Sequence, residues 1–332
     1  MHRPKYFLLT PGPLTTAVST KQAMLEDWGS WDDEFNEITA KICQDVLNLM
    51  EGEDDFVCVP MQGSGTFANE AALGSLFPPQ SKTLVLINGA YGHRLKKILS
   101  YMGKNCVSLD KGEYLPPLPH EVEEILQADP EITHVAVIHC ETSSGILNPV
   151  QEIGEVVKKY GKTYFIDAVS SFGALPMSQH DVPYDILVFS ANKCFEGVPG
   201  FGFVLVRKTI LEASKGISHS YSLDVYDQRQ GFLQTRKWRF TPPTHVVVAF
   251  REAMRLHAEE GGVQARLQRY ENNCEVLVRG LRELGLQTLL DDRWLSPIIV
   301  TFLSPQDANF KFQKFYDEMK KLNPKLESVD FK

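Results

Sequence analysis

The sequence has no paired cysteines, no block of basic residues and no long apolar run. Its six cysteines are scattered without a Cys-X-X-Cys pair, so we expect free thiols in a reducing compartment, with no disulfide framework and no zinc site. The net charge of −8, without clustered Lys and Arg, argues against nucleic acid as the main partner. No run of about 18 apolar residues occurs, and the first residues lack the apolar segment of a secretory signal. These absences predict a cytoplasmic protein that binds neither nucleic acid nor membranes.

Near-continuous apolar strands alternate with amphipathic helices along most of the chain. This pattern is typical of an α/β fold with a mostly parallel sheet and helices on both faces. The connection between the strands at 186–189 and 202–206 is too short for a crossover, so the second strand is predicted to return antiparallel. Strands are predicted at 56–60, 83–87, 106–109, 134–138, 163–166, 186–189, 202–206 and 297–302, and helices at 16–24, 34–50, 67–76, 92–102, 120–128, 150–160, 244–260, 263–284 and 310–322.

The length of 332 residues suits one large domain with a smaller one. Residues 1–15 are predicted to form an extended arm that turns at Pro11-Gly12-Pro13, where proline excludes a helix. Residues 16–245 are predicted to form the large domain. Residues 246–332 would hold two linking helices and a small C-terminal α/β domain, which looks incomplete because it has one strand and one helix.

A lysine and an aspartate each follow an apolar strand. Lys193 comes after the strand at 186–189, and Asp167 directly follows the strand at 163–166. A lysine amine can hold an aldehyde as a Schiff base, and an aspartate can keep a pyridine nitrogen protonated, which is what a pyridoxal phosphate site needs. Asp167 could instead cap a turn, and Lys193 could be an ordinary solvated lysine. The glycine-rich stretch Gly197–Gly200 after the lysine favours the functional interpretation.

Three further loops follow predicted strands. Gly63-Ser64-Gly65-Thr66 precedes a helix, so its N–H groups and hydroxyls could bind an anion at the helix N-terminus, although a plain capped turn has the same pattern. Tyr91 could stack on a planar cofactor or belong to a structural turn. Residues 139–145 place polar side chains at the carboxyl edge, where α/β sheets bind ligands. A nucleophilic pair of His139 with Cys140 is disfavoured, since adjacent side chains on an extended chain point to opposite sides.

Six stretches together resemble the class V, fold-type I aminotransferases. They are Leu-Thr-Pro-Gly-Pro at 9–13, Gln-Gly-Ser-Gly-Thr at 62–66, Asn-Gly-Ala-Tyr-Gly at 88–92, Glu-Thr-Ser-Ser-Gly at 141–145, Asp-Ala-Val-Ser-Ser at 167–171 and Ser-Ala-Asn-Lys at 190–193. The stretches at 31–33, 237–245 and 290–292 are most similar to the members that act on 2-aminoethylphosphonate and pyruvate. The resemblance runs from about Tyr6 to about Lys321.

The resemblance implies a fold, a cofactor and a set of roles. Pyridoxal phosphate would form a Schiff base with Lys193, which later moves the substrate proton, and Asp167 would pair with the pyridine nitrogen. The amino group of 2-aminoethylphosphonate would pass to pyruvate in a homodimer with shared active sites, giving phosphonoacetaldehyde and alanine. The resemblance assigns the other contacts as follows: the phosphate to Ser64, Gly65 and Thr66, the ring face to Tyr91, the ring hydroxyl to Thr142, and a further contact to Thr241 of the partner subunit.

The sequence departs from the family near its end. Family members continue into a Phe-Arg-Ile-Gly motif whose arginine grips the acidic group of the substrate, whereas no arginine follows Arg293 here. Arginine clamps anions through two parallel hydrogen bonds, so this departure predicts weak or absent turnover. His93, Arg94 and Arg239 are candidates for holding the phosphonate.

Three functions therefore remain open. The first is the phosphonate aminotransferase, which the stretches at 31–33 and 237–241 favour. The second is a relative with the same machinery and another substrate, of the alanine–glyoxylate or serine–pyruvate type. The third is a truncated form that binds the cofactor but is catalytically impaired. A cysteine desulfurase is disfavoured because the sequence has no separate cysteine loop.

Overall fold

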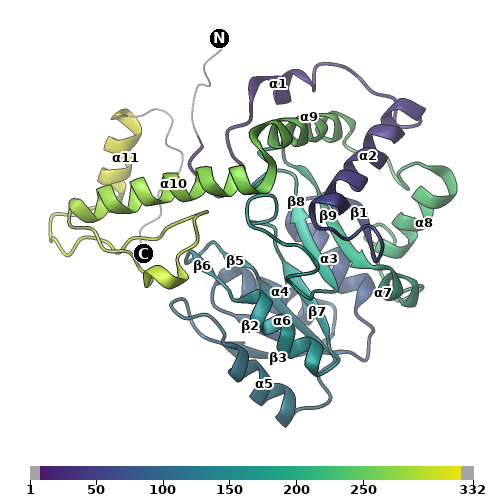
Figure 1. Ribbon diagram of the computed structural model, residues 1–332, viewed down its shortest axis with the longest axis horizontal. Coiled ribbons are helices and arrows are strands. Elements are labelled where there is room, and N and C mark those ends of the chain that lie inside the picture. Colours follow the sequence, from purple (N-terminus) through teal and green to yellow (C-terminus); the bar gives the residue numbers. More distant parts are fainter. Residues whose placement is uncertain (1–7, 323–332) are drawn as a thin grey trace.

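A seven-stranded sheet forms the centre of the computed structural model, which describes residues 8–322 (Figure 1). The expectations for the start of the arm (1–7) and for the segment 323–332 lie outside the described residues. Strand β9 runs antiparallel to both its neighbours β1 and β8, and the remaining strand pairs are parallel, as predicted. The strand order is β1 (Phe56–Gly63), β9 (Gly200–Arg207), β8 (Ile186–Ser190), β7 (Thr163–Asp167), β4 (His134–Ile138), β2 (Lys82–Ile87) and β3 (Asn105–Asp110).

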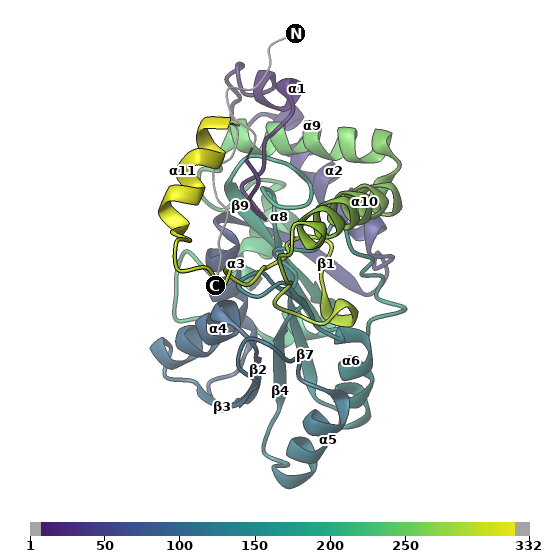
Figure 2. The ribbon, with the colours of Figure 1, turned by 90° about the vertical axis from the view of Figure 1, so that its left-hand side faces the viewer.

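Helices cover both faces of this sheet, which confirms the predicted layers (Figure 2). The alternation of side chains along β9 shows why: Phe203 and Leu205 enter one core, and Val204 and Val206 enter the other. The short helices α7 and α8 were not predicted. One face carries α2 (Asp33–Leu49), α5 (Pro119–Ala128), α6 (Val150–Lys159) and α9 (Thr244–Glu260); the other carries α3 (Gly65–Leu76), α4 (Ala90–Tyr101), α7 (Lys208–Ala213) and α8 (Val225–Thr235).

The helix α10 (Gly262–Glu283) extends away from the sheet toward α11 (Phe312–Leu322) (Figure 1). The prediction of a strand at 297–302 is wrong. This segment forms no ladder, and only isolated bridges join Phe302 to Thr288 and Leu295 to Ile146. A strand needs a neighbouring strand for its N–H and C=O groups, and Pro297 contributes no N–H. Apolar composition alone therefore did not make a strand here.

A short hairpin and a short helix lie outside the main sheet and its covering layers. Strands β5 (Cys140–Glu141) and β6 (Ile146–Leu147) form a separate hairpin beside the carboxyl edge of the sheet, and α1 (Val18–Gln22) is shorter than the predicted helix at 16–24. The six cysteines are free thiols, as expected. No helix within residues 8–322 combines the length and the apolar composition needed to cross a membrane.

The parallel direction of five strands positions the site. Strands β1, β2, β4, β7 and β8 all end at the same edge of the sheet, so the loops that follow them meet there. The candidate residues Ser64, Thr142, Asp167 and Lys193 lie at the ends of these strands or in the loops that follow them.

Candidate active site

Asp167 ends β7 and is buried, with 4% of its surface exposed. Its Oδ2 accepts a hydrogen bond of 2.6 Å from Asn69 Nδ2, and its Oδ1 accepts one of 2.8 Å from the Val169 N–H. Burial raises the pKa of this carboxyl to about 6, although the two hydrogen bonds lower it in part. Asn69 was missed by the sequence reasoning. The only signal was a polar side chain in a helix otherwise rich in Ala and Leu.

Lys193 lies in the loop that follows β8, at the same edge. Its Nζ donates a hydrogen bond of 2.8 Å to the carbonyl oxygen of Gly12, so the N-terminal arm lies against the lysine. Burial lowers the pKa of the amine, the nearby Arg94 lowers it further, and Asp167 raises it. Gly12 has a φ of +143°, and a Cβ there would approach the Lys193 side chain to 2.3 Å. Glycine is therefore required where the arm passes Lys193.

The residues of the predicted anion cradle, Ser64, Gly65 and Thr66, lie at the N-terminus of α3. Ser64 is the N-cap residue in an extended conformation, but its hydroxyl makes no capping hydrogen bond. Gly65 packs so closely on the loop after Asp167 that a Cβ would approach Val169 to 2.7 Å. The first N–H groups of a helix have no partner within the helix and carry positive dipole character. The cradle and Asp167 thus lie side by side.

Tyr91 lies in the first turn of α4, which begins two residues earlier than predicted, and a buried carboxylate holds it there. Glu141 Oε2 accepts hydrogen bonds from the N–H groups of Tyr91 (3.0 Å) and Gly92 (3.1 Å). The Glu141 side chain is 0% exposed, and its Oε1 accepts from Ser143 Oγ at 2.6 Å. A carboxylate stabilises the positive end of a helix, so Glu141 fixes the position of Tyr91. The sequence reasoning gave Glu141 no individual role.

Arg94 connects the cradle to Tyr91. Its Nη1 donates to Thr66 Oγ1 at 3.2 Å, and its guanidinium lies 4.5 Å from the centre of the Tyr91 ring. Of the three cations proposed for the phosphonate, Arg239 pairs with Asp227 at 3.0 Å and His93 lies 3.5 Å from Asp110. Among residues 8–322, no carboxylate lies within 4 Å of the Arg94 guanidinium.

Thr142 and Thr241 stand apart from these contacts. Thr142 occupies the turn between β5 and β6, next to Glu141. Thr241 is exposed in the loop between α8 and α9, where Gln62 Nε2 donates to the carbonyl oxygen of Phe240 at 3.4 Å. Neither threonine makes a hydrogen bond to Ser64, Thr66 or Lys193 in the part of the chain that the structure describes.

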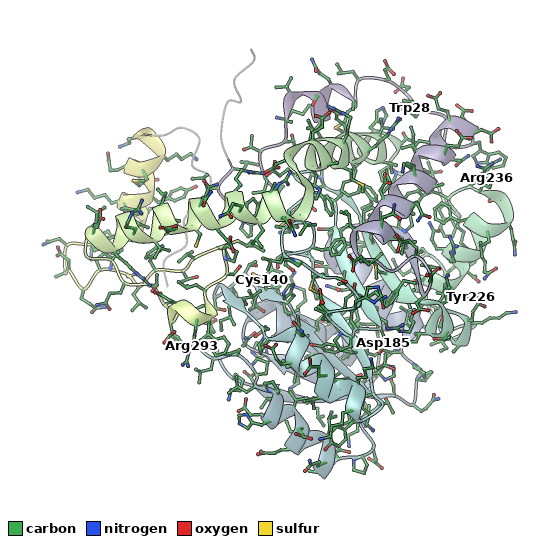
Figure 3. All side chains as sticks on the ribbon, viewed as in Figure 1. Trp28, Cys140, Asp185, Tyr226, Arg236 and Arg293 are labelled. Carbon is green, nitrogen blue, oxygen red and sulfur yellow. The ribbon has the colours of Figure 1, made fainter. Side chains whose placement is uncertain are left out.

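His139 and Cys140 point apart, as expected. His139 Nδ1 lies 2.9 Å from Ser171 Oγ, and burial lowers the pKa of the imidazole to about 4. Cys140 Sγ donates to Ser296 Oγ at 3.1 Å, and burial raises the pKa of the thiol to about 11 (Figure 3). A thiol that stays protonated beside no base cannot act as the nucleophile.

The residues at this edge fit pyridoxal phosphate. The buried Asp167 carboxyl has a pKa near 6, so a protonated ring nitrogen beside it would restore its charge. Ser190 Oγ is buried without a hydrogen-bond partner among the described residues, on the sheet face that α3 covers. A phosphate at the N-terminus of α3 would provide that hydroxyl with an acceptor. Lys193 supplies the amine.

Comparison with known proteins gives the same family. The model of the aminotransferase class-V family matches residues 28–315. A 2-aminoethylphosphonate–pyruvate transaminase of Rhizobium meliloti (strain 1021) is 58% identical over 315 residues, which are 95% of this chain and 82% of that protein. Transaminase 1 for the same substrates from Paraburkholderia xenovorans (strain LB400) is 54% identical, over 95% of this chain and 81% of its own length.

Solved structures support the fold. Ureidoglycine–glyoxylate aminotransferase from Bacillus subtilis has a TM-score of 0.89 at 21% identity and covers 100% of this chain and 85% of its own. Alanine–glyoxylate aminotransferase from Nostoc sp. also has a TM-score of 0.89, at 23% identity, over 98% of this chain and 86% of its own. At these identities the likeness concerns the fold alone, which is that of the α/β fold-type I aminotransferases, as expected from the sequence.

Proposed function

This chain belongs to the class V aminotransferases, and we propose that it transfers the amino group of 2-aminoethylphosphonate to pyruvate. The products are phosphonoacetaldehyde and alanine, and pyridoxal phosphate is the cofactor. The observation that carries the choice of substrate is the 58% identity, over 95% of the chain, with a transaminase named for this reaction. The half-buried Lys193 and the buried Asp167, at one edge of the sheet, support the cofactor.

Lys193 is proposed to hold the cofactor and to move the proton. When bound, pyridoxal phosphate supplies an electron sink for the negative charge that develops on the substrate carbon. Lys193 takes a proton from the carbon that carries the amino group of 2-aminoethylphosphonate. In the half-reaction with pyruvate it returns a proton to the carbon that becomes Cα of alanine. Burial lowers the pKa of its amine, which increases the neutral fraction that can act as a base.

The other site residues are proposed to orient and to bind. Asp167 holds the proton of the ring nitrogen, and Tyr91 covers one ring face from its position on Glu141. Ser64, Gly65 and Thr66 hold the phosphate at the positive end of α3. Thr142 contacts the ring hydroxyl, and Thr241 reaches the site of a partner subunit.

Arg94 is proposed to attract the phosphonate of the substrate. It is the candidate cation that contacts both Thr66 and Tyr91. Its positive charge also lowers the pKa of the Lys193 amine. A phosphonate with two negative charges can accept two parallel hydrogen bonds from the N–H groups of one guanidinium. Arg239 and His93 already lie beside Asp227 and Asp110.

The assembly and location are part of the proposal. We propose a homodimer in the cytoplasm, supported by the exposure of Thr241 and by the six free thiols. The units at 1–15, 16–245 and 246–332 are proposed as the domains. The extension of α10 beyond the sheet supports a separate C-terminal unit (Figure 1).

The proposed function is tested by asking which amine donates its amino group to the bound cofactor. 2-Aminoethylphosphonate, alanine and serine are added separately to protein loaded with pyridoxal phosphate, and the visible absorbance of the cofactor is followed. We expect 2-aminoethylphosphonate and alanine to bleach that band, because alanine is the product of the reverse half-reaction. Pyruvate should restore it after 2-aminoethylphosphonate, with release of phosphonoacetaldehyde. A response to serine but none to 2-aminoethylphosphonate would assign another substrate.

Two lysine variants test the assignment of the amine. Lys193→Ala should lose the visible band and the transfer. Lys104→Ala is the matched control, because burial also lowers the pKa of Lys104, to about 8, but its amine donates to the Phe77 carbonyl oxygen, away from the site. An unchanged band in Lys193→Ala would refute the assignment.

A further inference from the structure

The loop that contains Lys193 turns sharply and is held by its own backbone. The Glu196 N–H donates to the Lys193 carbonyl oxygen at 2.7 Å, and the Gly197 N–H donates to that of Ala191 at 3.0 Å. Glu196 has a φ of +59°, which a residue with a side chain adopts at a cost. A turn of this kind persists only where the surrounding structure fixes it.

A buried arginine of α10 contacts this loop from outside the sheet. Arg266 is 2% exposed, and its Nη1 donates to the carbonyl oxygen of Cys194, the residue after Lys193. The side chain of Cys194 is held as well, because its Sγ donates to the Ser170 carbonyl oxygen at 3.1 Å. The carbonyl groups of both Lys193 and Cys194 thus have fixed partners.

Carboxylates compensate the buried charge of Arg266. Glu260 Oε2 accepts from Arg266 Nε at 2.7 Å, and Glu260 Oε1 accepts from Arg269 Nε at 2.6 Å. Arg269 Nη2 also donates to Glu196 Oε1 at 2.8 Å, and Arg266 Nη1 lies 3.6 Å from the same oxygen, which closes a ring of four charged side chains. Although burial raises the pKa of Glu260, the two arginines lower it to about 2, so the carboxylate stays charged.

This ring joins two parts of the molecule. Glu260 is the last residue of α9, and Gly261 and Gly262 both have positive φ (+113° and +72°) where the chain reverses into α10. Arg266 and Arg269 lie in the first two turns of α10, whose far end extends away from the sheet (Figure 1). Glu196 belongs to the lysine loop. Any movement of the start of α10 therefore acts directly on the residue next to Lys193.

We infer that Arg266 is a positioning residue, which fixes the amine of Lys193 by holding the Cys194 carbonyl group. The inference rests on the proposed role of Lys193. Arginine suits this task, because it stays charged when buried and its planar fork reaches a carboxylate and a carbonyl oxygen at once. A displacement of about 1 Å at a reacting group can cost about a hundredfold in rate.

Arg266→Met tests the inference, with Arg207→Met as the matched control. Arg207 likewise donates to a backbone carbonyl oxygen, of Tyr184, and to a carboxylate, of Asp185. Asp185 (Figure 3) directly precedes β8, whereas Lys193 follows it, so the two residues lie at opposite edges of the sheet. Both variants should lower the unfolding temperature, so loss of stability alone does not separate a structural role from positioning.

Two measurements distinguish a positioning role of Arg266 from a merely structural one. Amide hydrogen exchange of residues 193–197 in the cofactor-free protein should become about tenfold faster in Arg266→Met and stay unchanged in Arg207→Met. In the loaded protein, the pH at which the visible band titrates should shift, and kcat should fall more than KM rises, in Arg266→Met alone. Equal exchange and equal titration in the two variants would overturn the inference, whatever their stability.

Arg266→Lys covers the case in which Arg266→Met does not fold. The lysine keeps the positive charge and can still donate to one acceptor. We therefore expect a folded protein in which the amides of residues 193–197 exchange faster than in the wild type, but less than about tenfold faster. Wild-type exchange and titration in this variant would contradict the need for a guanidinium. The exchange measurement needs no cofactor, and so it remains decisive for the Cys194 contact if Lys193→Ala shows that the proposed function is wrong.

Discussion

Asn69 donates its side-chain amide to Asp167 at 2.6 Å, across 98 positions of the sequence. This bond joins the first turns of α3, the proposed phosphate cradle, to the end of β7. It also stabilises the charged form of a buried carboxyl. Asn69 therefore sets both the position and the charge of the group proposed to face the ring nitrogen.

Asn69→Ala should weaken the binding of pyridoxal phosphate about tenfold. A hydrogen bond to a charged group contributes about 1.5–3 kcal/mol, and its loss raises the pKa of Asp167 further. Titration of the cofactor-free protein with pyridoxal phosphate, followed by the visible band, gives the dissociation constant. Ser75→Ala is the control, since Ser75 is a buried polar residue of the same helix whose hydroxyl bonds to the Ala71 carbonyl oxygen and the Val225 N–H, not to Asp167. Equal affinities in the two variants would show that the bond is unimportant for binding.

Asp167→Asn should stabilise the cofactor-free protein above pH 6. The folded pKa of about 6 exceeds the ordinary value of 3.8, so the folded carboxyl keeps a proton that the unfolded one has lost. The stability of the wild type therefore falls as pH rises between these values, by up to about 3 kcal/mol. Denaturant unfolding at pH 3.5 and pH 7.5 measures this. We expect a difference only at pH 7.5, and a less stable variant at that pH would contradict the prediction.

Glu141→Gln should loosen the start of α4 and displace Tyr91. The amide retains the shape but has no negative charge for the N–H groups of Tyr91 and Gly92. We expect a loss of about 1–3 kcal/mol in the free energy of unfolding. The circular dichroism of the bound cofactor should also change. Glu121→Gln serves for comparison, because Glu121 accepts from the Leu118 N–H at the start of α5, away from the site.

Arg94→Gln should raise KM for 2-aminoethylphosphonate by about 30-fold or more, because truncating one partner of a close charge pair costs at least about 2 kcal/mol. Steady-state kinetics with saturating pyruvate measure the change. Lys97→Gln removes one positive charge from the same helix, beside Tyr101, and should leave KM unchanged. Equal effects of the two substitutions would mean that Arg94 contributes only to the general electrostatic field.

Local patterns were sufficient for most of the helices and strands of the sheet, and for the loops that carry the site, but they missed α7 and α8. The apolar runs before Asp167 and Lys193 are strands, and the helices expected around 244–260 and 263–284 are α9 and α10. Side-chain periodicity is a property of a few consecutive residues, so it can be read without knowing the rest of the fold. The same reasoning produced the error at 297–302, because an apolar run cannot show whether a neighbouring strand exists.

The sequence by itself determined that a lysine, an aspartate and a glycine-rich turn would meet at one edge of a parallel sheet. That follows because parallel strands end on the same side. The tertiary structure alone decided which side chains hold the site residues in place by hydrogen bonds: Asn69 holds Asp167, Glu141 holds Tyr91, and Arg266 holds the loop of Lys193. Each of these contacts joins residues 50 to 98 positions apart. Such contacts depend on how helices and loops pack over the sheet, and no local pattern specifies that packing.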